Sequence, residues 1–284
     1  MRANKEQDEK SGYHPESEIL RVSKSSLMTY MKCPRQFYWD KVSGVPRPPK
    51  TDEMIRGTDV HEIMEVGMLQ GPDAMYATAT EMGLENDPGV VAMSDLLNMI
   101  AKDFGGLKIE EAEVKHLVYE EYEGHKIVWV GIIDAVLRHP DGGLIIAELK
   151  TGNMNVGKLS RTRKELVYYA RLLEQLNYDE VTHFLYITPD YEVPDKYSSD
   201  KLLEEANKRG KSVWVGDEYG IAIMEPISSR SINAFTKSLS IAIDSLKSQQ
   251  YPMKWSDYFC PQWCNYHLSC EGELSGLEES ILGE

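Results

Sequence analysis

The stretch 131-GIIDAVLRHPDGGLIIAELK-150 decides the fold, because it describes a β-hairpin with acidic residues at its open end. Two apolar runs flank His-Pro-Asp-Gly-Gly, which is a strong turn signal. If the turn is centred near Asp141, residues whose numbers sum to 282 lie opposite each other, and Asp134 and Glu148 form such a pair. Opposed side chains on one face have Cβ atoms about 4.5–5.5 Å apart, so these two carboxylates repel each other unless a cation compensates.

Carboxylate oxygens in this arrangement suit Mg²⁺ or Mn²⁺. Side chains alternate along a strand, so Lys150 shares a face with Glu148 while Leu149 points into the core. The pattern therefore predicts a patch where a metal ion, two carboxylates and an ammonium group converge. The alternative is an Asp and a Glu at solvent-exposed strand ends, with Lys150 as a surface partner. An isolated Asp…Glu-x-Lys pattern does not separate the two.

Helical and strand patterns surround this hairpin. We predict an α/β (α+β) fold in which a central mixed sheet is flanked by helices, with a helical insertion at about 70–110. Residues 1–20 are expected to form a disordered tail, 21–270 one domain, and 271–284 an acidic tail. The strands are expected at 114–122, 127–137, 144–149 and 183–188, with a hairpin at 214–224, and helices at 55–69, 162–176, 201–209 and 230–247.

The net charge of −15 argues against a general nucleic-acid coat protein, because phosphate binding depends on Lys and Arg. An enzyme needs only a local basic track, and Arg161, Arg163 and Lys164 form one; the alternative is a solvated helix face. No stretch approaches the roughly 20 apolar residues that span a bilayer, and residues 1–18 lack the apolar core of a secretory signal. We therefore expect a cytoplasmic protein with no membrane partner.

The four cysteines are expected to bind a metal, because thiols stay reduced in the cytoplasm. Cys260, Cys264 and Cys270 lie close together, whereas Cys33 lies far upstream. Soft thiolates favour an iron–sulfur cluster or zinc. A zinc ion could use Cys260, Cys264, His267 and Cys270 alone, which would leave Cys33 spare. A site that used all four cysteines would join the two ends of the chain.

Taken together, the motifs resemble the PD-(D/E)XK nuclease superfamily, and in particular its RecB-like iron–sulfur exonuclease branch. Gly-Ile-Ile-Asp134 and Glu148-Leu-Lys150 match its metal strands. Ser23-Lys-Ser-Ser-Leu27 leads to Cys33-Pro, and Gly57-Thr-Asp-Val-His61 matches its Gly-x-x-x-His helix. In the later Gln-x-x-x-Tyr helix, Glu165 stands where Gln is usual, four residues before Tyr169. CRISPR-associated adaptation exonucleases and helicase-linked nuclease domains share this order of motifs.

The resemblance implies that His61, Asp134, Glu148 and the Leu149 carbonyl bind the metal. By the same resemblance Lys150 activates water or stabilises phosphorane charge, and Glu165 and Tyr169 contact the DNA backbone or the lysine. It also implies a 4Fe–4S cluster; the cluster ligands would be Cys33, Cys260, Cys264 and Cys270. The residue pattern alone leaves His61 open as a core histidine and Tyr169 as part of an apolar stripe.

The sequence thus predicts a Mg²⁺- or Mn²⁺-dependent deoxyribonuclease, an exonuclease that acts on single-stranded DNA or DNA ends. The resemblance implies a role in CRISPR adaptation or in recombination and repair, with an integrase or a helicase as a possible partner. The alternative from another class is a DNA-binding or adaptor protein that keeps the fold but does not cut.

Overall fold

The structure, a computed structural model, describes residues 11–46, 49–195 and 199–276. The chain divides into two compact units. Unit 1 comprises Met1–Pro49, Leu117–Val130 and Thr236–Glu284, and unit 2 comprises Lys50–His116 and Gly131–Phe235. Strands β3 (Ile109–Tyr122) and β4 (His125–Arg138) and helix α8 (Ser229–Lys247) each contribute residues to both units. Within the described residues, no helix is both long and apolar enough to cross a bilayer.

Unit 2 contains a mixed sheet. The end of β4 pairs antiparallel with β5 (Leu144–Leu149), and β5 pairs parallel with β6 (Val181–Glu192). Strand β8 (Tyr219–Pro226) follows antiparallel to β6, with β7 (Ser212–Val215) beside it. This arrangement confirms the predicted mixed sheet, and α7 (Lys201–Ala206) is the short polar helix that the sequence predicted.

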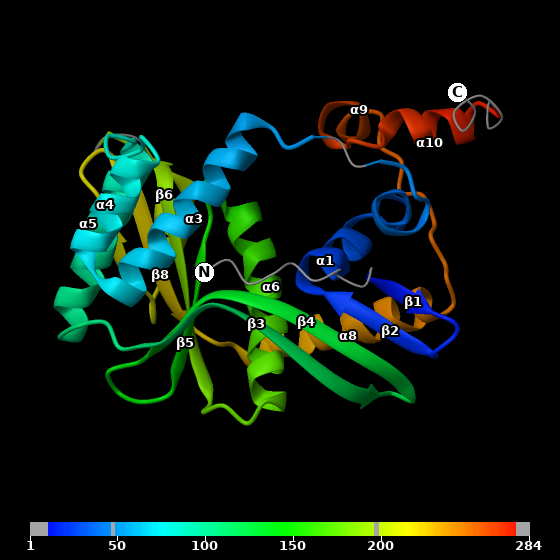
Figure 1. Cartoon of the computed structure of the whole chain (residues 1–284), viewed down its shortest axis with the longest axis horizontal. Coiled ribbons are helices and arrows are strands. Elements are labelled where there is room, and N and C mark those ends of the chain that lie inside the picture. Colours follow the sequence, from blue (N-terminus) through cyan, green and yellow to red (C-terminus); the bar gives the residue numbers. More distant parts are fainter. Residues whose placement is uncertain (1–10, 47–48, 196–198, 277–284) are drawn as a thin grey trace. The chain divides into compact units, whose positions relative to one another are not determined.

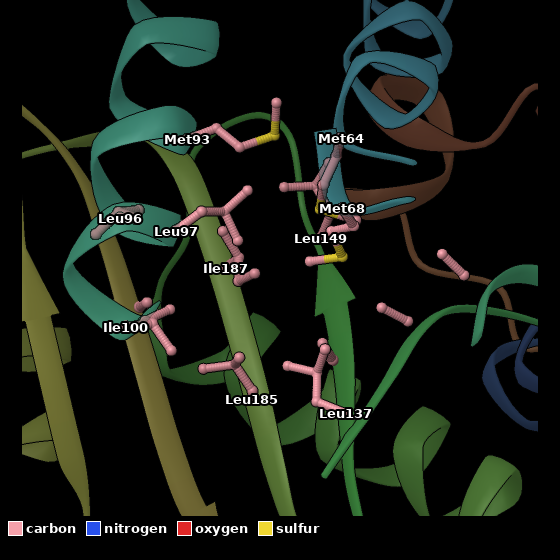
Figure 2. Packing of buried hydrophobic residues seen from close by; sticks show 14 of the residues in the cluster. Met64, Met68, Met93, Leu96, Leu97, Ile100, Leu137, Leu149, Leu185 and Ile187 are labelled. Carbon is pink, nitrogen blue, oxygen red and sulfur yellow. The ribbon is translucent and has the colours of Figure 1, made fainter. Parts of the chain in front are cut away.

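Helices cover both faces of this sheet (Figure 1). Helix α3 (Asp52–Gln70) is the helix predicted at 55–69, and α4 (Pro72–Glu81) and α5 (Pro88–Phe104) form the predicted helical insertion; all three pack on one face. Figure 2 shows this core, in which Leu97 and Ile100 of α5 lie opposite Leu185 and Ile187 of β6. Helix α6 (Val156–Gln175) contacts β5 and β6 and begins earlier than predicted, because Asn155 caps it by accepting the Lys158 N–H.

Unit 1 corrects the prediction for the first twenty residues. Strand β1 (Gly12–His14) pairs antiparallel with β2 (Ile19–Ser23), and β2 pairs parallel with the first half of β4. Leu20 and Val22 are buried, so a short alternating segment gains order from its place in the sheet although its surroundings are polar. Residues 1–10 lie outside the described part of the chain.

The cysteines of unit 1 lie in its helices or at their ends, with Cys33 between α1 and α2 and Cys264 at the end of α9. Ser23 caps α1 (Lys24–Lys32) through a capping box. Pro34 is the first residue of α2 (Pro34–Phe37), and a π-helical turn (Tyr38–Val42) follows α2. Helices α9 (Phe259–Trp263) and α10 (His267–Leu274) follow the last turn of α8. The first residues of the predicted acidic tail therefore belong to α10, and the rest, from 277, lies outside the described residues.

Candidate metal centre

The register of the β4–β5 hairpin is the one that the sequence predicted. Ala135 lies opposite Ala147, and Val136 lies opposite Ile146, so each pair sums to 282. Asp134 and Glu148 come next in this register, where the paired segment ends. Burial of the imidazole is the largest single effect on the pKa of His61 and lowers it, but the hydrogen bond with Glu113 and then the charges of Asp134 and Glu148 raise the pKa above its ordinary value. Both acids therefore lie close to the same histidine.

A group of three metal-ligand atoms lies at this end of the hairpin. His61 Nδ1 lies 3.5 Å from Glu113 Oε1 and 3.5 Å from Asp134 Oδ2. One ligand atom from each residue lies within 4.8 Å of the other two. The group joins helix α3, strand β3 and strand β4, and Asp134 is also fixed because its Oδ2 accepts the Leu149 N–H at 2.8 Å. An imidazole and two carboxylates form a donor set that suits a divalent cation.

Sequence reasoning missed Glu113. It lies in the acidic run Glu110-Glu-Ala-Glu113, just before the predicted strand, where charge normally faces solvent. In the structure β3 begins at Ile109, and Glu113 has a left-handed φ of 52° inside the strand. Such a conformation costs a non-glycine residue of order 1 kcal/mol or more and is frequent at functional sites. The acidic run was the only signal in the sequence.

Lys150 is held by two carboxylates. Its Nζ lies 2.5 Å from Glu148 Oε1 and 2.8 Å from Glu165 Oε2. The Glu148 side chain is only 2% exposed, so its charge is stabilised by the lysine rather than by water. Glu165 stands at a position where Gln is usual, and its carboxylate pairs with the ammonium group of Lys150.

Two glycines allow helices to approach the site closely. A Cβ on Gly57 would lie 2.9 Å from Thr151 Oγ1, so α3 packs directly against the segment that follows Lys150. A Cβ on Gly131 would lie 2.6 Å from Leu172 Cδ2 and 3.0 Å from Tyr169 Cε1. Gly57 lies about one helical turn before His61, and Gly131 lies three residues before Asp134 in its strand. Because neither glycine has a side chain, the neighbouring segments can pack closely beside His61 and Asp134.

With this geometry in view, the comparisons with known proteins identify the family. Residues 21–271 match the PD-(D/E)XK nuclease superfamily. The chain belongs to this superfamily. No curated protein matches it. Among solved structures, SSO0001 shares 15% identity over 88% of this chain and 85% of that chain, with a TM-score of 0.40. A phage-related exonuclease from Haemophilus somnus 129PT shares 12% identity over 81% of this chain and 95% of that chain, with a TM-score of 0.34. These two likenesses are too low to refine the assignment.

In this PD-(D/E)XK chain, Tyr169 is a buried residue of α6 that is 2% exposed. Its hydroxyl donates to the Ile132 carbonyl, two residues before Asp134. Burial, followed by the charges of Glu148 and Asp134, raises the pKa of Tyr169, so the hydroxyl keeps its proton and remains a donor. Tyr169 thus positions the end of β4, and its predicted contact with the DNA backbone remains a prediction.

The predicted basic track of this nuclease domain divides into two kinds of residue. Arg161 and Lys164 are exposed on α6. Arg163 instead donates to both oxygens of buried Glu225, and Tyr186 donates to the same carboxylate at 2.7 Å. The hydrogen bonds to Glu225 raise the pKa of Arg163 although burial opposes this. Arg163 is therefore engaged within unit 2, whereas Arg161 and Lys164 point to solvent.

All four cysteines of the PD-(D/E)XK chain are free thiols in unit 1, and Cys260 and Cys270 are buried. Burial raises the pKa of Cys264, with further contributions from Cys260 and Cys33. Burial also raises the pKa of Cys270 to about 11, and Cys264 and Cys33 add to this rise. Cys33 is thus one of the groups that raise the pKa of both Cys264 and Cys270. The His267 Nδ1 lies 3.0 Å from the Cys264 carbonyl oxygen.

Proposed function

We propose that this member of the superfamily is a metal-dependent deoxyribonuclease, an exonuclease that hydrolyses phosphodiester bonds in single-stranded DNA or at DNA ends. The observation that carries the proposal is the group of His61, Glu113 and Asp134, whose ligand atoms lie within 4.8 Å of one another next to a lysine held by two carboxylates. A DNA-binding protein that does not cut has no need of a buried carboxylate pair together with an ammonium group at one end of a hairpin.

The donor set fits Mg²⁺ or Mn²⁺. His61, Glu113 and Asp134 would hold the ion, and Glu148 and the Leu149 carbonyl are the further candidates from the family resemblance. A bound divalent ion lowers the pKa of water and polarises a phosphoryl oxygen. Such an ion would also offset the mutual repulsion of the carboxylates, to which Lys150, His61 and the Leu149 N–H already contribute.

The residues of the chain supply the rest of the chemistry. Lys150 presents an ammonium group that can donate to a phosphate oxygen and stabilise the charge that develops during hydrolysis. Glu148 and Glu165 fix the position of its Nζ, because two charge-assisted hydrogen bonds restrict a flexible side chain. Exposed Arg161 and Lys164 can contact the DNA backbone from the same helix as Glu165.

The test is digestion of single-stranded oligonucleotides labelled at the 5′ or the 3′ end, with Mn²⁺ or Mg²⁺ and with EDTA as a control. We expect wild type to shorten the strand from one end and Lys150→Ala to lose at least about 100-fold in rate. The label that is released first gives the polarity, and an RNA strand of the same sequence tests the preference for DNA. Equal products from wild type and Lys150→Ala would leave the adaptor function as the better description.

The pathway rests on the family resemblance alone. CRISPR adaptation or recombination and repair would supply the single strands and DNA ends on which such an enzyme acts, with an integrase or a helicase as partner. Co-purification of the full chain with one of these partners, compared with a variant of Arg161 and Lys164, separates a protein-mediated from a DNA-mediated association.

For the cysteines, we propose a 4Fe–4S cluster bound by Cys33, Cys260, Cys264 and Cys270. The effects of Cys33 on the pKa values of Cys264 and Cys270 support it, because a zinc site made of Cys260, Cys264, His267 and Cys270 does not require Cys33. A zinc ion also needs its ligand atoms closer together than a four-iron cluster does, and none of these cysteines enters a three-ligand group within 4.8 Å in the described part of the chain. Anaerobic purification followed by iron, sulfide and zinc analysis decides between the two. Colourless protein that contains zinc and no iron would favour zinc.

A further inference from the structure

An arginine outside the metal group joins two carboxylates. Arg56 donates from Nε and Nη2 to Asp87 at 2.7 and 2.6 Å, and from Nη1 and Nη2 to Asp190 at 2.9 and 2.8 Å. All four hydrogen bonds are charge-assisted, and the two bidentate pairs fix the plane of the guanidinium group. The bonds to Asp87 and then Asp190 raise the pKa of Arg56, and Arg56 in turn lowers the pKa of Asp87.

Each partner belongs to a different element of unit 2. Arg56 lies on α3, five residues before His61 and next to Gly57. Asp87 caps α5 by accepting the backbone N–H groups of its first turn. Asp190 lies on β6, and its Oδ2 also accepts the N–H of Gly152 at 2.5 Å. Gly152 follows Lys150 by two residues, so the arginine links the helix of His61 to the segment that leaves β5.

The space around this arginine is kept open by a glycine. A Cβ on Gly89 would lie 2.2 Å from Asp190 Oδ1 and 2.6 Å from Arg56 Nη2. Glycine is unfavourable inside a helix by about 1 kcal/mol relative to alanine, so its place in the first turn of α5 needs a reason. The reason is the approach of Arg56 and Asp190, which any larger residue would block.

We propose that Arg56 is a positioning residue of the nuclease site, which acts through Asp190 to hold His61 and Lys150 in register. The inference rests on the proposed function but concerns residues that touch neither metal nor substrate. Two contacts tie α3 to the segment after β5, namely Gly57 against Thr151 and Arg56 through Asp190 to Gly152. Loss of the contact through Arg56 and Asp190 lets the metal group and Lys150 shift relative to each other. A shift of about 1 Å in a catalytic group can cost about 100-fold in rate.

A second arginine in unit 2 provides a matched control. Arg138 also joins two carboxylates, Glu110 at 2.8 Å and Asp179 at 2.5 Å, and its side chain is 32% exposed against 31% for Arg56. It lies at the turn end of the hairpin, and neither of its partners belongs to the metal group, although Glu110 precedes Glu113 by three residues in β3. The two arginines thus have similarly exposed side chains and two carboxylate partners each, but the partners of Arg138 are 39% and 66% exposed, against 14% and 18% for those of Arg56.

The experiment compares Arg56→Lys with Arg138→Lys in the full-length protein. Lysine keeps the charge but loses the bidentate geometry. We expect Arg56→Lys to lower kcat about 100-fold with KM for an oligonucleotide within about threefold of wild type, and to weaken Mn²⁺ binding, followed by electron paramagnetic resonance without DNA. Arg138→Lys should change neither quantity, and its melting temperature should fall by no more than that of Arg56→Lys, because its carboxylate partners are more exposed. Asp190→Asn should lose less than Arg56→Lys, because its amide oxygen still accepts the Gly152 N–H.

Three results overturn the proposal: an unchanged Mn²⁺ binding curve in Arg56→Lys, equal losses of kcat in Arg56→Lys and Arg138→Lys, or a loss that follows melting temperature alone. If Arg56→Lys gives little folded protein, Asp190→Asn carries the same test. Wild-type protein that cuts no oligonucleotide counts against the proposed function, whereas the role of Arg56 is still judged by Mn²⁺ binding.

Discussion

The two ends of the β4–β5 hairpin handle charge in opposite ways. At the open end, Asp134 has a side chain that is only 9% exposed, and it faces a second carboxylate across a shared histidine. At the turn end, Arg138 lies between two carboxylates at the surface. Surface ion pairs of the second kind contribute about 0–1 kcal/mol to stability. Buried like charges cost stability, and the cation proposed for the open end would offset that cost.

The largest expected effect comes from Asp134→Asn. The change removes a ligand charge and should lower cleavage about 1000-fold or more, because both metal binding and charge stabilisation depend on it. Without metal the variant should melt at a higher temperature than wild type, since it removes repulsion between carboxylates. Initial rates with Mn²⁺ and thermal melts in EDTA give the two quantities.

Asp141→Asn is the matched control for this prediction, because it makes the same change in the turn at the other end of the hairpin. It should alter neither rate nor metal response. Comparable losses of activity in both variants would mean that the open end has no special role, and the contrast between the two ends would fail.

Glu113→Gln should have the next largest effect. It keeps the size of a side chain whose carboxylate lies 3.5 Å from His61 but removes its charge. We expect the Mn²⁺ concentration for half-maximal activity to rise about 10-fold or more, with a smaller change in the rate at saturating Mn²⁺. Glu110→Gln, a change in the same strand at the partner of Arg138, should leave the metal response unchanged. A titration in which the two variants coincide would remove Glu113 from the metal group.

The outcome for these residues indicates how far sequence reasoning reached. The hairpin register followed from alternation and one turn, so the proximity of Asp134 and Glu148 was predictable from local signals. The family resemblance allowed Glu165 to contact either the DNA backbone or Lys150, and the structure contains the contact with Lys150. The mixed sheet and its helices were also predictable, because each element carries its own periodicity.

Other features depended on contacts between distant segments. Glu113 joins the group only because β3 extends to Ile109 and takes a left-handed turn at that residue. Arg56 meets Asp190 across 134 positions of sequence, and no local pattern marks either residue. The order of β1 and β2 likewise depends on pairing with β4. Non-local pairing of this kind is invisible to periodicity and turn chemistry.

Glycines at the two ends give a third prediction, in stability. Gly131→Ala places a methyl group against Leu172 and Tyr169 and should destabilise the fold by about 1–3 kcal/mol through overpacking. Gly142, in the turn, has open space around it but a φ of 104°, so Gly142→Ala should cost about 1–2 kcal/mol through backbone strain alone. Urea denaturation measures both losses of stability.

Gly131→Ala should also lower activity, because Tyr169 positions the strand that carries Asp134, whereas Gly142→Ala should not. Full activity in Gly131→Ala would show that this packing does not set the position of Asp134.

The smallest expected effect lies at the turn end, where His139 and His183 stack with ring centroids 4.3 Å apart and an interplanar angle of 6°. Burial, and then the neighbouring His139, lowers the pKa of His183 below the value near 6.5 of an unfolded chain. The unfolded state therefore binds this proton more readily than the folded state, and stability falls as pH drops below about 6.5. Between pH 7.5 and pH 5.5 the melting temperature of wild type should fall more than that of His183→Gln, by about 1 °C. The pKa of His61 is raised, so its titration makes stability rise as the pH drops. The effect of the stacked pair is therefore the difference between the melting-temperature change of wild type and that of His183→Gln. If both melting temperatures fall equally, the stack does not respond to pH.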